Sequence, residues 1–334
     1  MPQTANPIGK HGLELPRLGL GTASLGNFLG TVTDEQAVET IELARTSGIR
    51  YFDTAPLYGH GLAERRLAQG LAGAPRDEVV ISTKVGRLLR AGAPRDESQY
   101  FDGQPFYTDV PEQGPVWDFS YEGVRTSLAE SLERLGTDRV DILNLHDPDN
   151  HFAEASTTAY AALHDLREEG VVRGIGAGMN STGVLTDLVR ECDLDVVLLA
   201  GRYTLLDQSS MADLLPACTD RSTMVIVGGV FNSGILIDPK PDARFDYVPA
   251  DEARIERAQR IQEVCRSFDV PLAAAAIQFP LAHPAVASLL IGARSATELQ
   301  DDFDLLDVPI PGALWRRLQT EGLLAEDVLV PAGR

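Results

Sequence analysis

Eight short apolar segments, separated by helix-like stretches, constrain the fold of this chain more than any other feature. Most are continuous apolar runs without period-two alternation, as expected for parallel strands buried on both faces. Eight such strands alternating with helices favour a closed barrel over an open doubly wound sheet. The segments are 18–22, 49–54, 79–85, 140–146, 172–177, 196–200, 224–228 and 286–291. We therefore predict an α/β fold, a (β/α)8 TIM barrel.

No change of composition marks a linker, so we predict a single domain over residues 1–334, with a core of about 13–308 and a tail of 309–334. Helix signals fill the intervals between the strands. Capping-box patterns begin at Thr33 and Ser295, and Ser120 precedes a helix that ends at Gly136. Two further helices are predicted over 157–169 and 251–268.

The longest interruption of this alternation is the segment 86–119, which is rich in aromatic residues, proline and glycine. A loop of this length in a compact domain is usually functional or disordered. It follows the third strand and so belongs to the face where barrel active sites form. We predict a lid over a ligand; the alternative is a loop packed on the barrel without substrate contact.

Charge and cysteine content limit the partners of the protein. Lys and Arg number 29 against 49 Asp and Glu, a formal net charge of −20 that repels phosphate backbones and anionic membranes. We expect no nucleic-acid or membrane partner. Cys192, Cys218 and Cys265 are far apart and form no CxxC pair, so neither a disulfide framework nor a metal site is predicted. The N-terminal residues lack the apolar region of a signal peptide, and we expect a cytoplasmic protein.

Four residues at predicted strand ends suggest proton-transfer chemistry. Asp53 ends the second strand, Tyr58 lies in the following loop, Lys84 is near the end of the third strand, and His146 ends the fourth. An ammonium beside a phenol is expected to lower its pKa, a carboxylate orients the ammonium, and an imidazole positions a substrate oxygen. Taken singly, each residue also has a structural interpretation: a buried Asp53–Lys84 ion pair, a loop tyrosine and a core histidine.

The sequence resembles the aldo-keto reductase family from residue 18 to about 305. Four segments carry the resemblance: GIRYFDTAPLYG (48–59), ISTKVG (81–86), DILNLH (141–146) and IGARS (291–295). The resemblance implies a (β/α)8 barrel that binds an extended nicotinamide cofactor without a Rossmann fold. It also implies that Asp53, Tyr58, Lys84 and His146 are the catalytic tetrad. Consistent with this, no GxGxxG motif opens a βαβ unit.

The same resemblance implies a set of cofactor contacts. Tyr203 corresponds to the aromatic residue that stacks on the nicotinamide, Asn180 to a carboxamide contact, and Arg294 with Ser295 to the adenosine-phosphate site. Acidic Glu298 and Asp302 stand where phosphate-binding relatives have other side chains, which favours NAD over NADP; alternatively, Arg294 holds a 2′-phosphate, or Glu298 only closes the capping box. The loop expected to cover the pyrophosphate contributes Gly229, Phe231, Asn232, Ser233, Gly234 and Leu236.

Within the family, LYGHGLAERR (57–66), GMN (178–180) and FNSG (231–234) resemble the branch of aldose 1-dehydrogenases and pyridoxal 4-dehydrogenases. This implies an NAD(P)-dependent oxidoreductase that acts on a small polar substrate, an aldose such as L-fucose or L-galactose. The alternatives are a pyridoxal 4-dehydrogenase, a general aldehyde or ketone reductase, and, in another class, a non-catalytic subunit that senses nicotinamide. No oligomeric state is assigned.

Overall fold

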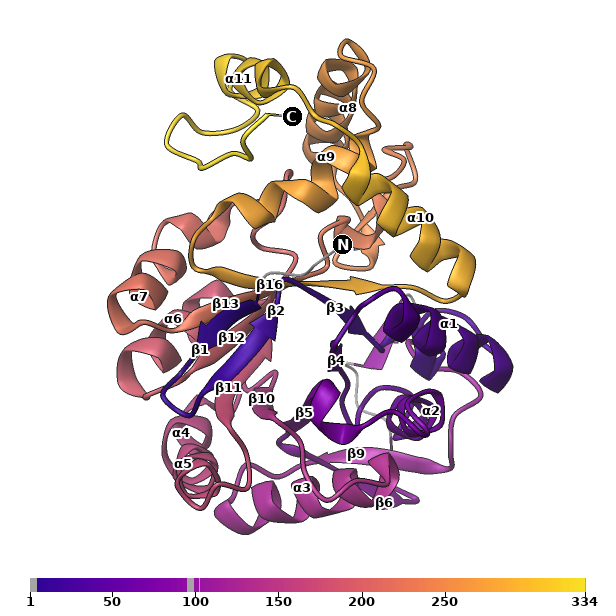
Figure 1. Cartoon of the computed structure of the whole chain (residues 1–334), viewed down its shortest axis with the longest axis vertical. Coiled ribbons are helices and arrows are strands. Elements are labelled where there is room, and N and C mark those ends of the chain that lie inside the picture. Colours follow the sequence, from indigo (N-terminus) through magenta and orange to yellow (C-terminus); the bar gives the residue numbers. More distant parts are fainter. Residues whose placement is uncertain (1–4, 95–98, 102, 334) are drawn as a thin grey trace.

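The computed structural model describes residues 5–94, 99–101 and 103–333, and its centre is a closed barrel of eight parallel strands (Figure 1). All eight predicted strands are confirmed. Each strand pairs in parallel with both neighbours, with a register shift between β13 and β16 at Val225 and Ile226, and the barrel closes where β16 pairs with β3. In order around the barrel the strands are β3 (Leu18–Gly21), β4 (Tyr51–Asp53), β5 (Val80–Val85), β10 (Ile142–His146), β11 (Gly174–Met179), β12 (Val196–Ala200), β13 (Met224–Gly228) and β16 (Val286–Gly292).

Helices surround the barrel, and two of them begin at the predicted capping residues Thr33 and Ser120. The Thr33 and Gln36 side chains form a full capping box, and Ser120 accepts a hydrogen bond from Gly123 N. The helix predicted over 157–169 is wound more loosely at its start, where a π-helical turn covers Ala155–Ala159. The barrel helices are α1 (Asp34–Thr46), α2 (Leu62–Gly70), α3 (Tyr121–Leu135), α5 (Tyr160–Glu168), α6 (Thr182–Glu191), α7 (Leu214–Arg221), α9 (Leu272–Gln278) and α10 (Ala296–Asp307).

The closed end of the barrel is formed by an antiparallel hairpin of β1 (Ala5–Ile8) and β2 (Leu13–Pro16), which the sequence did not predict. Ile8, Leu13 and Leu15 are at most 1% exposed and belong to the same core cluster as the inward side chains of the strands. Burial of apolar surface of this kind stabilises by roughly 25 cal/mol per Å². The hairpin thus completes the barrel interior from below.

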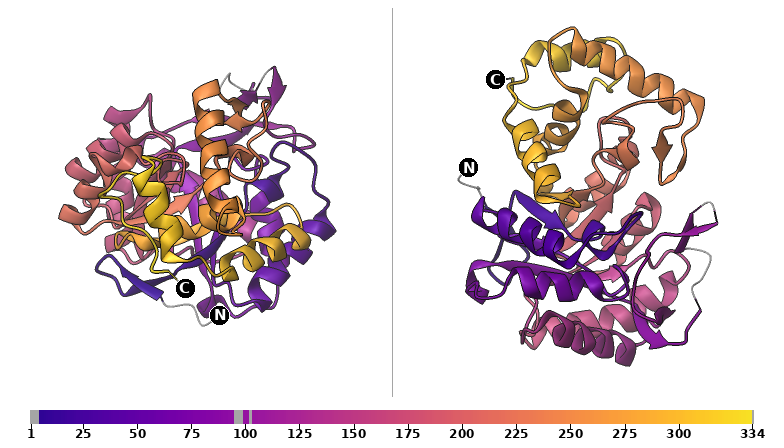
Figure 2. Two further views of the ribbon diagram at one scale, coloured as in Figure 1. Left: turned by 90° about the horizontal axis from the view of Figure 1, so that it is seen from above. Right: turned by 90° about the vertical axis from the view of Figure 1, so that its right-hand side faces the viewer.

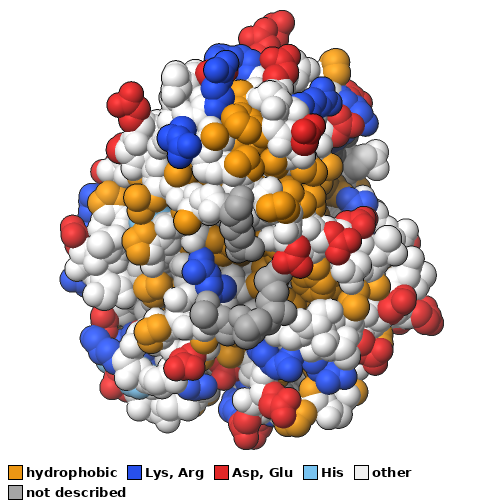
Figure 3. Space-filling view, turned by 45° about the horizontal axis from the view of Figure 1, so that its top comes forward, with side chains coloured by type: hydrophobic (Ala, Val, Ile, Leu, Met, Phe, Trp, Pro, Cys, Tyr) orange, Lys and Arg blue, Asp and Glu red, His pale blue; other side chains and the backbone are white. Residues whose placement is uncertain are grey.

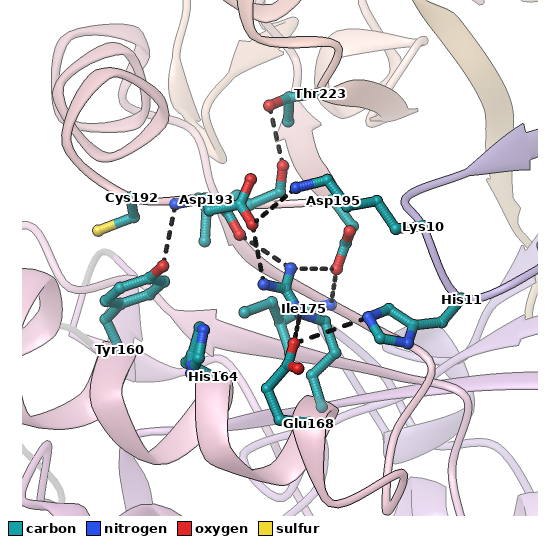
Figure 4. A network of polar contacts seen from close by, with 12 residues as sticks. Lys10, His11, Tyr160, His164, Glu168, Ile175, Cys192, Asp193, Asp195 and Thr223 are labelled. Atoms are coloured by element: carbon teal, nitrogen blue, oxygen red, sulfur yellow. Dashed lines mark hydrogen bonds and ion pairs between the residues drawn. The ribbon is translucent and has the colours of Figure 1, made fainter.

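Two aspartates fasten neighbouring strands at this closed end. Asp141, just before β10, accepts hydrogen bonds from Ile81 N at 2.9 Å and Arg76 Nη2 at 2.7 Å. Asp195, just before β12, accepts from Ile175 N and from Arg167 Nη1, both at 2.9 Å, within the network shown in Figure 4. Asp141 thus joins the start of β10 to β5, and Asp195 joins the start of β12 to β11, so the two pairs of strands are fastened in the same way.

The segment 86–119 folds back on itself in the described residues. Its arms are β6 (Arg87–Ala91) and β9 (Gln113–Trp117), which pair antiparallel, and short strands β7 (Tyr100–Phe101) and β8 (Gln104–Pro105) lie farther along it. Part of this segment, 95–98 and 102, lies outside the described residues. The hairpin starts directly after β5, so its base is fixed beside the strand that carries Lys84.

Two helices extend the chain beyond the barrel, α8 (Glu252–Arg266) and α11 (Gly312–Thr320), and Figure 2 shows them side by side. Trp315 of α11 is fully buried, so the tail packs as part of the structure. Between β13 and α8 the strands β14 (Arg244–Phe245) and β15 (Val248–Pro249) form a small hairpin. Short helical turns are α4 (Phe152–Glu154), η1 (Ser24–Gly26), η2 (Arg76–Glu78), η5 (Ser209–Met211), η6 (Asn232–Gly234) and η7 (Phe279–Ala282).

Charges of both signs are interspersed on the face in Figure 3. The three cysteines are buried and unpaired, in agreement with the prediction that they form no disulfide. Among the described residues, no helix combines the length and apolar character that crossing a membrane requires.

Candidate active site

The four side chains predicted to act together meet at the carboxyl ends of the strands. Lys84 Nζ lies 2.6 Å from Asp53 Oδ2, donates to Thr54 O at 3.0 Å and stands 4.5 Å from the centre of the Tyr58 ring. The Tyr58 and His146 rings meet edge to face, with centroids 5.6 Å apart. Since β4, β5 and β10 are neighbours in the barrel, residues distant in sequence are brought into one cluster.

Tyr58 is held by its backbone rather than by a strand. Its N–H donates to Ala55 O at 3.1 Å, and its own carbonyl accepts from Ala63 N at 3.2 Å, at the start of α2. The loop also touches η1 directly: a Cβ built on Gly26 would lie 2.7 Å from the Tyr58 carbonyl carbon. Such a contact is shorter than real Cβ atoms show, so only glycine allows the two backbones to approach this closely.

Asp53 is oriented by a second layer inside the barrel that the sequence analysis did not single out. Ser82 Oγ donates to Asp53 Oδ1 at 2.6 Å, and Tyr51 OH lies 2.9 Å from Ser82 Oγ. Ser82 and Tyr51 are fully buried. The carboxylate is therefore fixed from both oxygens, by Ser82 on one and by Lys84 on the other.

The protonation states of the two groups at the mouth are set mainly by burial. Burial, and then the charge of Asp53, raises the pKa of the Tyr58 phenol well above its ordinary value. This differs from the prediction that the Lys84 ammonium lowers the pKa of the phenol: burial dominates, and the lowering contribution comes from Arg87. Burial, with the positive charges of Arg87 and Lys84, holds the pKa of His146 well below its ordinary value. At neutral pH the cluster therefore presents a protonated phenol and an uncharged imidazole.

A second charged pair flanks the imidazole. Arg87 Nη2 donates to Asp147 Oδ2 at 2.9 Å, and the Arg87 guanidinium lies 4.0 Å from the centre of the Trp117 ring. Asp147 Oδ2 is also 3.6 Å from His146 Nε2. Sequence reasoning missed this pair, although its members stand three residues after Lys84 and directly after His146.

Aromatic rings from three loops gather next to Tyr58. Tyr107 of the 86–119 segment lies with its ring centre 6.4 Å from that of Tyr58. Phe28 contacts both Tyr107, tilted at 5.3 Å, and Tyr247, edge to face at 4.9 Å. Phe106 is 5.8 Å from Tyr247. The segment predicted as a lid thus places aromatic rings beside the catalytic cluster and in contact with the loop that follows β13.

The residues implied for the nicotinamide and pyrophosphate differ in how accessible they are to a ligand. Asn180 is exposed. Tyr203 is fully buried, with ring centres of Phe279 and His283 at 5.3 and 5.6 Å, so its ring offers no open face in this structure. In the loop after β13, the Asn232 side-chain amide already bonds within the protein: it donates to Gly201 O at 3.0 Å and accepts from Thr204 Oγ1 at 2.6 Å. The other residues implied for the pyrophosphate are its neighbours in the same loop, Gly229, Phe231, Ser233, Gly234 and Leu236.

The residues implied for the adenosine end are together at the start of α10. Ser295 Oγ accepts from Glu298 N at 3.2 Å, and Glu298 Oε2 accepts from Arg294 N at 2.9 Å, one residue before the bond that a capping box requires. Arg294 is exposed. An exposed guanidinium at a helix N-terminus suits a phosphate, so the residues present fit a nicotinamide nucleotide. Burial and the neighbouring acids raise the pKa of Asp302 to about 7.

Comparisons with known proteins agree with this geometry. The profile of the Aldo/keto reductase family matches residues 17–320. A D-threo-aldose 1-dehydrogenase from a Pseudomonas species is 43% identical, over 97% of this chain and 99% of its own, and a pyridoxal 4-dehydrogenase from Microbacterium luteolum is 40% identical, over 95% and 97%. An aldo-keto reductase from Bacillus halodurans, in its holo form, has the same fold, with a TM-score of 0.74, 24% identity and 98% coverage of both chains.

Proposed function

The chain belongs to the aldo/keto reductase family and is an oxidoreductase that uses a nicotinamide cofactor; from this premise we propose that it oxidises an aldose at the anomeric carbon, with NAD preferred. The observation that carries the proposal is the convergence of Tyr58, Lys84, Asp53 and His146 at one end of the barrel. The Pseudomonas relative, matched over almost its whole length, supports an aldose as the substrate.

The chemistry divides between the cofactor and the cluster. When bound, the nicotinamide accepts a hydride from the reacting carbon or returns one to it. Tyr58 takes the proton from the anomeric hydroxyl in oxidation, leaving a lactone, and gives a proton to the carbonyl oxygen in reduction. Lys84 keeps positive charge beside the phenol, and Asp53 holds that lysine in place. Acid–base assistance of this kind contributes about 10²–10⁴ in rate.

The uncharged imidazole of His146 suits a positioning role. It keeps an N–H donor for the substrate oxygen without delivering a proton of its own, because its pKa lies well below the ordinary value. Its ring lies edge to face with that of Tyr58, with centroids 5.6 Å apart, so the two side chains are close enough to share one substrate oxygen.

Absorbance of the reduced cofactor tests the proposal directly. The purified protein is given L-fucose, L-galactose and pyridoxal, each with NAD and with NADP. We expect turnover of the aldoses, and its loss by at least 100-fold in Tyr58→Phe. Tyr121→Phe, which alters a surface tyrosine bonded to Asp165, serves as the control. Turnover of pyridoxal alone would assign the activity of the Microbacterium relative instead, and full turnover by Tyr58→Phe would remove the proposed mechanism.

The preference for NAD rests on Glu298, an exposed carboxylate whose Oε2 is already anchored at the start of α10. Its negative charge opposes a 2′-phosphate. Glu298→Gln removes the charge and keeps an oxygen for the Arg294 N–H. Isothermal titration calorimetry should find NAD bound more tightly by the wild type, and the ratio of the NADP to the NAD dissociation constant should fall several-fold in the variant. Tighter binding of NADP by the wild type would reverse the assignment.

A further inference from the structure

Neither Arg87 nor Asp147 gives or takes the proton in the reaction described above, yet the pair is built into the same site and its charges act on Tyr58 and His146. Arg87 is 6% exposed, although arginine is seldom buried. Its guanidinium carbon lies over the Trp117 ring, 4.0 Å from the ring centroid, and its Nε has no hydrogen-bond partner among the described residues. A buried donor without a partner costs free energy unless a ligand or water satisfies it.

Asp147 is held in an unusual backbone conformation. Its φ is 44°, in the left-handed region that side-chain-bearing residues seldom adopt, and its N–H donates to Gly178 O at 3.1 Å. This conformation directly after His146 turns the carboxylate back toward Arg87 and the imidazole. Oδ2 lies 2.9 Å from Arg87 Nη2 and 3.6 Å from His146 Nε2.

The pair is asymmetric in its access to solvent. The Arg87 side chain is 7% exposed and that of Asp147 is 37% exposed, so the aspartate is partly accessible while its partner is buried. Ion pairs with an exposed member contribute little to stability, about 0–1 kcal/mol. A role in binding explains better than stability why a strained aspartate is placed beside the catalytic imidazole.

The position of Asp147 relative to Tyr58 and His146 indicates which part of a substrate the Arg87–Asp147 pair can bind. The proposed function puts the substrate oxygen between Tyr58 and His146, whose rings lie 5.6 Å apart, and Asp147 Oδ2 lies 3.6 Å from His146 Nε2. We propose that Asp147, supported by Arg87, binds the hydroxyl group on the carbon next to the reacting carbon. The substrate class is then 2-hydroxy carbonyl compounds and their cyclic hemiacetals. This inference rests on the proposed function, because it deepens the substrate class of that same site.

Two aldehydes that differ in one hydroxyl group test the inference. 2-Hydroxypropanal and propanal are reduced with NADH, and the ratio of their kcat/KM values is measured. We expect the wild type to favour 2-hydroxypropanal by on the order of tenfold or more, since a charged acceptor strengthens a hydrogen bond to a hydroxyl. Asp147→Asn keeps the shape and removes the charge, and Arg87→Met removes the support; both should bring the ratio to within about threefold of one.

Arg90→Met is the matched control. Arg90 lies on the same strand as Arg87, pairs with Glu130 and is 42% exposed, so its loss should leave the ratio unchanged. Thermal melting checks that each variant is folded. If Arg87→Met does not fold, the ratio measured for Asp147→Asn alone tests the inference.

The results separate this inference from the proposed function. A wild-type ratio near one, or equal losses for both aldehydes in Asp147→Asn, overturns the inference whether or not aldoses are oxidised. A tenfold ratio that Asp147→Asn abolishes, in an enzyme that does not oxidise L-fucose or L-galactose, supports the inference and removes only the proposed aldose.

Discussion

Lys84 and Asp53 form an ion pair of 2.6 Å whose side chains are only 2% and 3% exposed. Such a pair is costly to remove from water, and it persists here because further bonds satisfy both partners: Thr54 O accepts from the ammonium, and Ser82 donates to the carboxylate. The finding links catalysis with stability, because the groups that tune Tyr58 also fill the barrel interior.

Removing the lysine should therefore affect folding as well as activity. Lys84→Met leaves Asp53 buried without its counter-charge, and we expect the free energy of unfolding to fall by roughly 3–5 kcal/mol. Lys240→Met, which removes an exposed pair with Asp238, should leave the free energy of unfolding nearly unchanged. Urea denaturation measures both, and equal stability of the two variants would contradict the account.

Ser82 is expected to act as a positioning residue for Asp53. Ser82→Ala frees Asp53 Oδ1, so we expect kcat to fall by about tenfold while KM changes by less than about twofold. Tyr51→Phe leaves the bond between Ser82 and Asp53 in place and should have a smaller effect. Steady-state kinetics with the preferred substrate compares the two variants. A larger fall of kcat in Tyr51→Phe than in Ser82→Ala would contradict the positioning role of Ser82.

The two directions of the reaction should respond differently to pH. The pKa of Tyr58 lies above its ordinary value, so the phenol is protonated at neutral pH and serves reduction there, whereas oxidation needs the deprotonated form. Oxidative kcat/KM should rise with pH through the alkaline range. Because Arg87 lowers the pKa of Tyr58, Arg87→Met should move this rise to still higher pH. An oxidation rate that is greatest below neutrality is incompatible with this assignment.

The contact between Gly26 and the Tyr58 backbone predicts a specific sensitivity. Gly26→Ala introduces a Cβ 2.7 Å from the Tyr58 carbonyl carbon and must push the tyrosine out of line. We expect kcat to fall by on the order of 10- to 100-fold. Gly183→Ala, on α6 where nothing lies within 4 Å, should retain full activity and be slightly more stable. If both variants keep wild-type kcat, the contact does not position Tyr58.

The barrel strands and the catalytic cluster were predictable because both depend on local signals. Each strand is an apolar run between helix caps, and Asp53, Lys84 and His146 end such runs, so the topology alone brings them together. Thr33 and Ser120 likewise marked helix starts through neighbours only three residues away.

Features that depend on distant contacts could not be predicted in the same way. The pairing of Arg87 with Asp147 spans 60 residues, and the contact of Tyr247 with Phe28 joins opposite parts of the chain. The raised pKa of Tyr58 follows from burial, which no local motif encodes. Tyr203 has an aromatic side chain suited to stacking, but its packing against Phe279 is set by a helix far along the sequence.

The hairpin of β1 and β2 has a practical consequence for where this protein can be cut. The family profile matches from residue 17, directly after the hairpin, yet Ile8, Leu13 and Leu15 fill the barrel from below. A shortened chain that starts at residue 17 would keep every barrel strand but would expose the interior side chains near Tyr51 to water. The segment matched by the family profile is thus shorter than the unit that packs together.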